Sequence, residues 1–285
     1  MKIAILSGKG GTGKTLVSVN LAAVAKESVY IDCDMEEPNG HLFFKPNDIK
    51  RSKVTVKIPV IDYTKCIKCR KCVDFCKFNA LAFIKDKIKV YKEICHSCGG
   101  CKLICPVGAI SEIDKEVGEI QEGYFEEVKV YTGILDTGKA SGSPIIKRLF
   151  EESKGNEDIT FIDCPPGSAC IVMESIKDAD YCLLVAESSL FGVHNLQMVS
   201  ELVTLFNKPH GVILNKCGEG ENLAEIFCND NKIKIMGRIP FDKKLGTLNS
   251  NGLIAVKESE KYNKSFQALL ENILMEVRHE AIINS

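Results

Sequence analysis

The chain has 285 residues, a formal net charge of -1, and 45% hydrophobic and 26% charged residues, which is ordinary for a soluble globular protein. Its longest apolar stretches, such as Tyr181 to Ala186, are too short to span a bilayer, so we expect no membrane partner. The fourteen cysteines do not indicate a disulfide scaffold, because the start of the chain carries no secretory signal. We therefore expect reduced thiols and a cytoplasmic protein.

Short apolar runs and helical patterns alternate along most of the chain. Lys2 to Leu6 is typical of a buried parallel strand, a helix should begin at about Gly13, and Val29 to Asp32 reads as a second strand. The pattern lapses between about His41 and Glu122. Further strands are expected at Val128–Tyr131, Ile159–Asp163, Tyr181–Ala186, His210–Asn215 and Lys234–Ile239. This alternation predicts an α/β fold, with a mostly parallel sheet and helices on both faces.

A phosphate-binding sequence follows the first strand. It satisfies G-x-x-x-x-G-K-[ST] with Gly8, Lys9, Gly10, Gly11, Thr12, Gly13, Lys14 and Thr15. Glycines let backbone N–H groups surround phosphate oxygens, while Lys14 would reach the β- and γ-phosphates and Thr15 the Mg²⁺. Guanine-specific P-loop proteins use N-K-x-D, but Asn215-Lys216-Cys217-Gly218 lacks the aspartate. The expected nucleotide is therefore ATP.

Eight cysteines form two copies of C-x2-C-x2-C-x3-C that are related by a shift of 29 residues. They are Cys66, Cys69, Cys72 and Cys76, then Cys95, Cys98, Cys101 and Cys105. Bacterial ferredoxins use this spacing to hold two [4Fe–4S] clusters, with the fourth cysteine of each run bound to the other cluster. We expect Cys105 to join the first three cysteines and Cys76 to join the second three. The alternative is two zinc sites or a cysteine-rich loop without metal.

Basic residues predominate around the cysteines. Between His41 and Lys102 there are fifteen Lys or Arg residues and five acidic ones. Such a surface would attract an acidic electron carrier, for example a ferredoxin or flavodoxin. A generic solvated face that offsets the negative clusters is the simpler alternative. Nothing basic outside this segment suggests a nucleic-acid partner.

The form GKGGTGKT resembles the deviant Walker A sequence of the MinD/ParA/Mrp/nitrogenase-iron-protein superfamily. This resemblance implies a P-loop NTPase fold and a nucleotide-dependent dimer, formed with a second copy or with a paralogue, in which Lys9 contacts the partner's nucleotide. It further implies that Asp34 orients the attacking water, that Asp32 lies near Mg²⁺, and that Asp163 is the Walker B carboxylate. Asn215 and the loop at Pro240 would contact adenine.

Similarity to one branch of this superfamily, ATPases that contain an inserted ferredoxin domain, implies three segments. We expect a first ATPase segment at 1–58, a small α+β ferredoxin-like domain at 59–123 and a second ATPase segment at 124–285. Cys164 and Cys170 flank the region where nitrogenase iron proteins bind a cluster between subunits, so an additional bridging cluster is one hypothesis and a packed thiol is the other. The apolar positions between Phe266 and Val277 predict a helix that packs against the sheet.

Three functions fit these features. The leading hypothesis is an ATPase whose dimer rearrangement controls electron transfer through two [4Fe–4S] clusters. The second is a carrier or maturation protein for iron–sulfur clusters, although the chain lacks the C-terminal C-x-x-C of Mrp-type carriers. The third is a ParA-like positioning ATPase whose clusters sense redox state.

Overall fold

A nine-stranded sheet forms the centre of the computed structural model, which describes residues 1–25, 27–139, 141–155 and 159–283. The strand order is β11-β10-β9-β1-β8-β2-β7-β6-β3. Every neighbouring pair from β11 to β7 is parallel, whereas β6 and β3 add antiparallel pairs at one edge. This arrangement confirms the expected α/β class.

The parallel strands coincide closely with the expected apolar runs. They are β1 (Lys2–Leu6), β2 (Ser28–Asp32), β7 (Val128–Leu135), β8 (Ile159–Asp163), β9 (Tyr181–Glu187), β10 (His210–Cys217) and β11 (Ile235–Pro240). Their inner residues are almost completely buried, as expected for strands covered on both faces.

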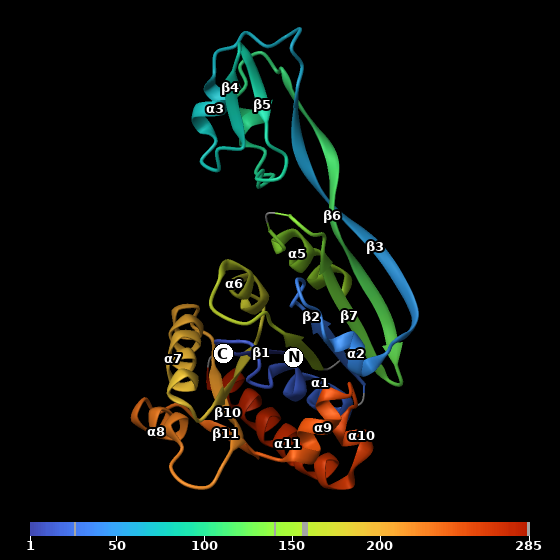
Figure 1. Cartoon of the computed structure of the whole chain (residues 1–285), viewed down its shortest axis with the longest axis vertical. Coiled ribbons are helices and arrows are strands. Elements are labelled where there is room, and N and C mark those ends of the chain that lie inside the picture. The colour runs from blue at the N-terminus through green and yellow to red at the C-terminus, as the bar shows by residue number, and fades with distance from the viewer. Residues whose placement is uncertain (26, 140, 156–158, 284–285) are drawn as a thin grey trace.

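Helices cover both faces of this sheet (Figure 1). One face carries α1 (Lys14–Ala25), α10 (Ala255–Glu258) and α11 (Glu260–Ile283), whose apolar residues share one core. The other carries α5 (Ser143–Glu152), α6 (Cys170–Ile176), α7 (Leu190–Leu205) and α8 (Leu223–Asp230) around a second core. Phe266, Ile273 and Val277 of α11 are buried against the sheet, so its predicted packing is confirmed.

Among the described helices none is long and apolar enough to cross a membrane.

Two long strands, which the sequence had not predicted, occupy the region where the alternating pattern lapsed. β3 (Asn47–Ile61) and β6 (Ile110–Phe125) form an antiparallel ribbon on either side of the cysteine runs. Much of the ribbon is exposed, and charged side chains such as those of Lys53 and Glu116 pair across it. The alternation that identifies a half-buried strand is present in one part of β3, where Val54, Val56 and Ile58 alternate with polar residues and Val54 and Ile58 are buried. The expected segment boundaries at residues 59 and 123 fall inside β3 and β6.

The ribbon leaves the main sheet at Gly118. β7 pairs with β6 only from Gly118 to Phe125, and β3 has a register irregularity between Val54 and Thr55, opposite this point. Beyond it, Thr55–Ile61 and Ile110–Val117 extend away from the sheet, and no third strand pairs with them in the described part of the chain. At 3.3 Å per residue, this free part is roughly 23 Å long.

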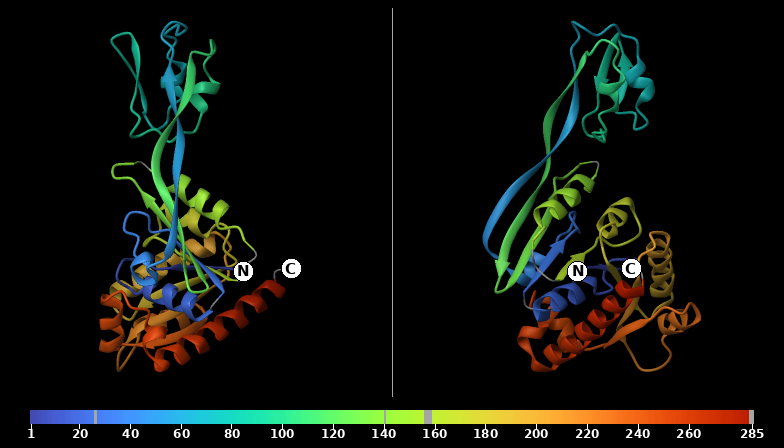
Figure 2. Two further views of the ribbon diagram at one scale, coloured as in Figure 1. Left: turned by 90° about the vertical axis from the view of Figure 1, so that its right-hand side faces the viewer. Right: turned by 180° about the vertical axis from the view of Figure 1, so that it is seen from behind.

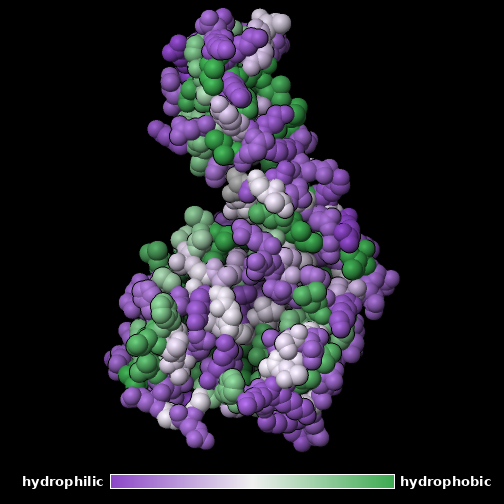
Figure 3. Space-filling model, in the orientation of Figure 1, coloured by the Kyte–Doolittle hydropathy of each residue, from purple (hydrophilic) through white to green (hydrophobic). Residues whose placement is uncertain are grey.

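A small domain that contains the eight cysteines lies at the far end of the ribbon, and we call it the tip domain, residues 62–109 (Figures 1 and 2). Its elements are α3 (Lys71–Phe75), β4 (Leu81–Ile84), β5 (Lys87–Val90) and α4 (Gly100–Leu103). Its core has six buried residues, of which two are Cys72 and Cys101 and two, Ile61 and Ile110, belong to the adjoining ends of the ribbon. So small a core needs cross-links for stability. A narrow neck separates this domain from the main body (Figure 3).

Two further short helices lie close to the nucleotide-binding loop described below. α2 (Gly40–Phe44) follows β2, and α9 (Lys243–Ser250) follows β11.

Gly118→Ala should destabilise the protein at the base of the ribbon. A Cβ at this position would lie 2.1 Å from the carbonyl oxygen of Ile134, a backbone atom that cannot move independently of the sheet. We expect a loss of about 1–3 kcal/mol in the free energy of unfolding, as for other overpacked sites. Urea unfolding, followed by circular dichroism, measures it.

Gly246→Ala is the matched control for this substitution. Gly246 is exposed within α9, and a Cβ at this position would have no neighbour within 4 Å among the described residues. Alanine there should stabilise the helix by about 0.5–1 kcal/mol. Equal effects of the two substitutions would contradict the close approach at Gly118.

Candidate functional site

The glycine-rich loop lies at the carboxyl end of β1 and leads directly into α1. Gly11 and Gly13 have φ angles of 78° and 94°, which glycine adopts without strain. A cavity of about 450 Å³ opens over this loop. It is lined by Ser7, Gly10, Gly11, Thr12, Gly13, Lys14, Thr15, Leu16, Asp34, Glu37, Asn39, Leu42, Phe43, Pro166, Asn249, Ser250 and Gly252. Loop, helix N-terminus and cavity together form an anion site of the P-loop kind.

Lys14 and Asp163 form a buried ion pair beneath this cavity. Lys14 Nζ donates to Asp163 Oδ1 at 2.6 Å, and the hydroxyl of Tyr30 donates to Asp163 Oδ2 at 2.9 Å. Burial alone would lower the pKa of Lys14, but the carboxylates of Asp163, Asp32 and Asp34 outweigh it and raise that pKa. Lys14 is therefore charged and available to a phosphate group.

Asp32 holds the loop that contains Asp34. Its carboxylate accepts hydrogen bonds from the backbone N–H groups of Asp34 at 3.0 Å, Asn39 at 3.1 Å and Gly40 at 2.9 Å. Burial, followed by repulsion from Asp163, raises the pKa of Asp32 to about 7. Asp34 itself lines the cavity. The predicted residues Asp32, Asp34 and Asp163 thus converge on one end of the nucleotide loop.

Lys9 does not lie over its own loop, because it forms an ion pair with Glu187 at the end of β9. Glu187 also accepts from Lys216, at 3.3 Å, and Lys216 Nζ donates to the carbonyl of Gly11 at 2.7 Å. Glu187 was not among the residues predicted from the sequence. Its signal was a charged residue directly after a buried parallel strand, at the edge of the sheet where ligands bind.

Asn215 is hydrogen-bonded to the glycine-rich loop. Its amide donates to the carbonyl oxygen of Thr12 at 2.7 Å, and its Oδ1 accepts from the N–H of Lys216 at 2.9 Å. Pro240 lies beside Cys217 at the end of β11 and is not among the residues that line the cavity. Adenine contacts of Asn215 and Pro240 therefore stay a prediction. Asn249, which was not predicted, lines the cavity with a buried Oδ1 that has no hydrogen-bond partner among the described residues.

The eight predicted cysteine ligands form two groups in the tip domain. Cys66, Cys69, Cys72 and Cys105 line one cavity, and Cys76, Cys95, Cys98 and Cys101 line the other. The structure thus brings together the two sets that the ligand exchange predicted. The cavities beside the two sets measure about 20 and about 410 Å³. Four thiols on each side are the donor set of [4Fe–4S] clusters.

The two sets have matching surroundings. The N–H of Ala80 donates to Cys76 Sγ at 3.3 Å, and the N–H of Ala109 donates to Cys105 Sγ at 3.2 Å. Hydrogen bonds to cysteine sulfur stabilise thiolates and tune the potential of bound clusters. On the larger cavity, the rings of Phe78 and His96 stack with centroids 3.8 Å apart.

The two cysteines near Asp163 differ in accessibility. Cys164 is completely buried, which prevents it from bridging two subunits in this conformation. Cys170 is exposed at the first residue of α6, so a bridging role for it stays a prediction.

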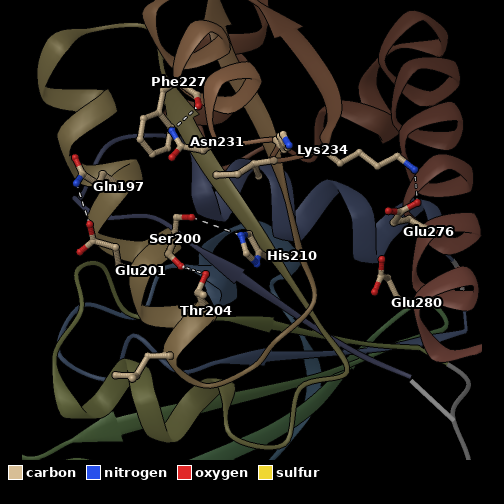
Figure 4. Close-up of a pocket in the computed structure, with 13 residues that line it drawn as sticks. Gln197, Ser200, Glu201, Thr204, His210, Phe227, Asn231, Lys234, Glu276 and Glu280 are labelled. Atoms are coloured by element: carbon tan, nitrogen blue, oxygen red, sulfur yellow. Dashed lines mark hydrogen bonds and ion pairs between the residues drawn. The ribbon is translucent and has the colours of Figure 1, made fainter. Parts of the chain in front are cut away.

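A larger cavity, of about 740 Å³, lies away from both sites (Figure 4). His210 and Lys234 place it at the amino ends of β10 and β11, between α7, α8 and α11. Ser200 Oγ lies 3.5 Å from His210 Nε2, and Lys234 pairs with Glu276. Ligands of open parallel sheets bind at the opposite, carboxyl edge, so size alone does not identify the functional site.

A family model described as CobQ/CobB/MinD/ParA nucleotide binding domain matches residues 3–256. The chain belongs to this family. MinD, the cell division ATPase of Pyrococcus furiosus, has a similar structure, with a TM-score of 0.61, 19% identity and coverage of 96% of this chain and 98% of that one. The chain is thus a P-loop ATPase of the MinD/ParA superfamily.

Other relatives bear on the domain that contains the eight cysteines. An uncharacterized protein of Methanocaldococcus jannaschii is 32% identical over 96% of both chains, and another from the same organism is 29% identical over 86% of this chain and 87% of that one. An iron–sulfur cluster carrier protein of Methanococcus maripaludis is 25% identical over 98% of this chain and 86% of its own length. A ferredoxin of Pyrobaculum islandicum is 33% identical over 102 residues, 35% of this chain and 87% of that one. This chain therefore combines the family's nucleotide-binding fold with a ferredoxin-like domain.

The raised pKa of Asp32 predicts a pH dependence of the nucleotide-free protein. A carboxyl group whose pKa rises from 3.8 in the unfolded chain to about 7 in the fold binds more protons when folded. Its contribution to stability is therefore lost as the pH rises through this window. The unfolding free energy, measured in urea at several pH values from 4 to 8, should fall with pH, and Asp32→Asn should flatten the slope.

Asp230→Asn, at an exposed position in α8, is the control and should leave the slope unchanged. A slope that is the same in wild type and Asp32→Asn would contradict the assignment.

Proposed function

We propose that the protein hydrolyses ATP with Mg²⁺ and that its nucleotide state controls electron transfer through two [4Fe–4S] clusters in the tip domain. The observation that carries this proposal is a hydrogen-bonded connection between the segment after β2, which contains Asp34, and the base of the ribbon. This connection links the nucleotide site mechanically to the tip domain, although the ribbon holds the two apart.

The connection begins next to Asp34. The backbone oxygen of Met35 accepts from the N–H of Leu135 at 3.1 Å, and the N–H of Asp136 donates to the oxygen of Val117 at 3.0 Å. Val117 precedes Gly118, where the ribbon leaves the sheet. A shift of Asp34 and Met35 during hydrolysis would therefore be transmitted to the ribbon and the tip domain.

Residues around the loop have distinct roles in nucleotide chemistry. Lys14 would exchange Asp163 for the β- and γ-phosphates, Thr15 would bind the Mg²⁺, and Asp34 would orient the attacking water. Asp163, released from Lys14, would contact the metal's water shell. The unpartnered Oδ1 of Asn249 is an acceptor for an amino group of the nucleotide base.

Lys9 is the residue through which a second subunit would enter the site. In this conformation it is paired with Glu187, so dimer formation requires that contact to open. The second subunit would be another copy or a paralogue, a possibility supported by the two different relatives in one organism.

The partner we propose is an acidic electron carrier such as a ferredoxin or flavodoxin. Bound clusters exchange single electrons, and the surface beside Cys66 and Cys105 would receive the carrier. Ile67, which lines the cavity of Cys66 and Cys105, is 61% exposed, and Leu103, two residues before Cys105 in the chain, is 87% exposed. Lys65, Lys68 and Lys71 are nearby in the chain. An apolar centre with basic surroundings suits a transient acidic partner.

Paired cysteine substitutions test which thiols share a cluster. If Cys105 belongs with Cys66, the double variant Cys66→Ala/Cys105→Ala damages one cluster and keeps about half of the iron. Cys66→Ala/Cys76→Ala then damages both clusters and loses nearly all of it. Iron and sulfide analysis with EPR of the reduced protein, purified without oxygen, gives the measurement.

Cys182→Ala, in β9 and far from the tip domain, should retain all of the iron. The reverse ranking of the two double variants would show that each run of four cysteines binds its own cluster.

Nucleotide control is tested by the rate at which the reduced clusters pass electrons to an acceptor. We expect this rate to differ by about fivefold or more between the ATP and ADP states, a typical coupling between two sites. Lys14→Ala should abolish both the difference and the release of phosphate from ATP. Phosphate release together with equal electron-transfer rates in the ATP and ADP states would refute the coupling but not the ATPase activity.

The second candidate is an iron–sulfur cluster carrier, which the similarity to a carrier protein favours. Incubation of the cluster-loaded protein with a cluster-free acceptor and ATP separates the two functions. A carrier loses iron to the acceptor, whereas an electron-transfer protein retains all of it.

A further inference from the structure

A cavity of about 390 Å³ lies between the tip domain and the ATPase domain. It is lined by Val56, Lys57, Lys92, Glu93, Cys95, His96, Ser97, Lys115, Val117, Lys139, Ser141, Ser143, Pro144 and Lys147. These residues come from the free part of the ribbon, from the start of the second cysteine run, and from the loop and first turn of α5. The cavity shares no residue with the one over the nucleotide loop.

Five lysines line this cavity against a single acid, Glu93. Lys57 pairs closely with Asp114, at 2.8 Å, whereas Lys115 lies 3.8 Å from Glu93 and Lys147 lies 3.9 Å from Glu174. Lys92 and Lys139 have no carboxylate within 4.0 Å in the described part of the chain. The cavity therefore carries an excess of positive charge.

The lysines approach from opposite sides of the gap. Lys57, Lys92 and Lys115 belong to the ribbon and the tip domain, whereas Lys139 and Lys147 belong to the ATPase domain. Like charges that face one another repel, and the repulsion is strongest where solvent is partly excluded. A bound anion would remove this repulsion and connect the two domains.

Hydrogen-bond donors suited to an anion accompany the lysines. The hydroxyls of Ser97, Ser141 and Ser143 lie in the lining, and Ser97 Oγ is buried without a hydrogen-bond partner among the described residues. Ser141 Oγ donates to Ser143 Oγ at 3.2 Å and accepts from the Ser143 N–H at 3.2 Å, which leaves the Ser143 hydroxyl hydrogen for an anion. Ser143 is also the first residue of α5, a ten-residue helix whose N-terminus adds partial positive charge. Ammonium groups with hydroxyls and a helix N-terminus are typical phosphate ligands.

We propose that this cavity binds a compact phosphate-type anion with at least two negative charges, held jointly by the tip domain and the start of α5. Two sources share this chemistry: free phosphate or pyrophosphate, and the phosphate group of a small organic ester. The anion would fix the second cysteine run, at Cys95 to Ser97, relative to the ATPase domain.

Calorimetric titration of the full chain tests the proposal, with inorganic phosphate, pyrophosphate and glycerol phosphate as separate probes. The nucleotide loop is first saturated with Mg²⁺ and a non-hydrolysable ATP analogue, so that it does not compete for the probes. We expect at least one probe to bind, and its identity distinguishes the two sources. The affinity should fall by about tenfold or more in Lys139→Ala/Lys147→Ala, because two charges are removed.

Lys264→Ala, at an exposed lysine of α11, is the matched control and should bind the probes like wild type. Hydrogen exchange gives a second readout, since the bound anion should slow exchange at 92–97. No binding by any probe, or an equal loss of affinity in the control, would overturn the proposal. So would an unchanged affinity in the double variant.

Discussion

The pairing of β3 with β6 determines how a structural change in the ATPase domain can reach the tip domain. Through it, a domain that begins soon after Asp34 in sequence lies at the end of a two-stranded extension, away from the nucleotide loop. Closeness in sequence to the first switch element therefore does not place the clusters beside the nucleotide. Any mechanical effect of hydrolysis has to pass through the base of the ribbon, where Val117, Gly118 and Asp136 meet.

The nucleotide loop shows how such an effect could start. Without phosphate, Lys14 is neutralised by Asp163, and Lys9 by Glu187. Both lysines would change partners when a nucleotide and a second subunit bind. Since Asp32 anchors the backbone of Asp34, Asn39 and Gly40, the segment that follows β2 behaves as one unit. Its contact from Met35 to Leu135 then connects these exchanges to the ribbon.

The sequence predicted the parts of this structure that have strong local signals. Buried parallel strands appear as continuous apolar runs, and the phosphate loop and cysteine spacings are set by the geometry of their ligands. The ribbon was not predicted because apolar and polar residues alternate only between Val54 and Ile58 of β3, and the spacing of apolar residues along β6 is irregular. The sequence did not predict the roles of Glu187, Tyr30 and Asn249, because these roles depend on contacts between segments that are distant in the chain.

The tip domain has a core of six residues and joins the main body through two strands. A region with so few buried contacts opens at lower free energy than the nine-stranded sheet, and it can do so by itself. We therefore expect the tip domain to unfold in a transition of its own, ahead of the larger transition of the sheet that the urea measurements follow. Oxidative loss of a cluster would unfold the tip alone. The ATPase domain would remain folded, so the same chain could bind a new cluster and refold its tip domain.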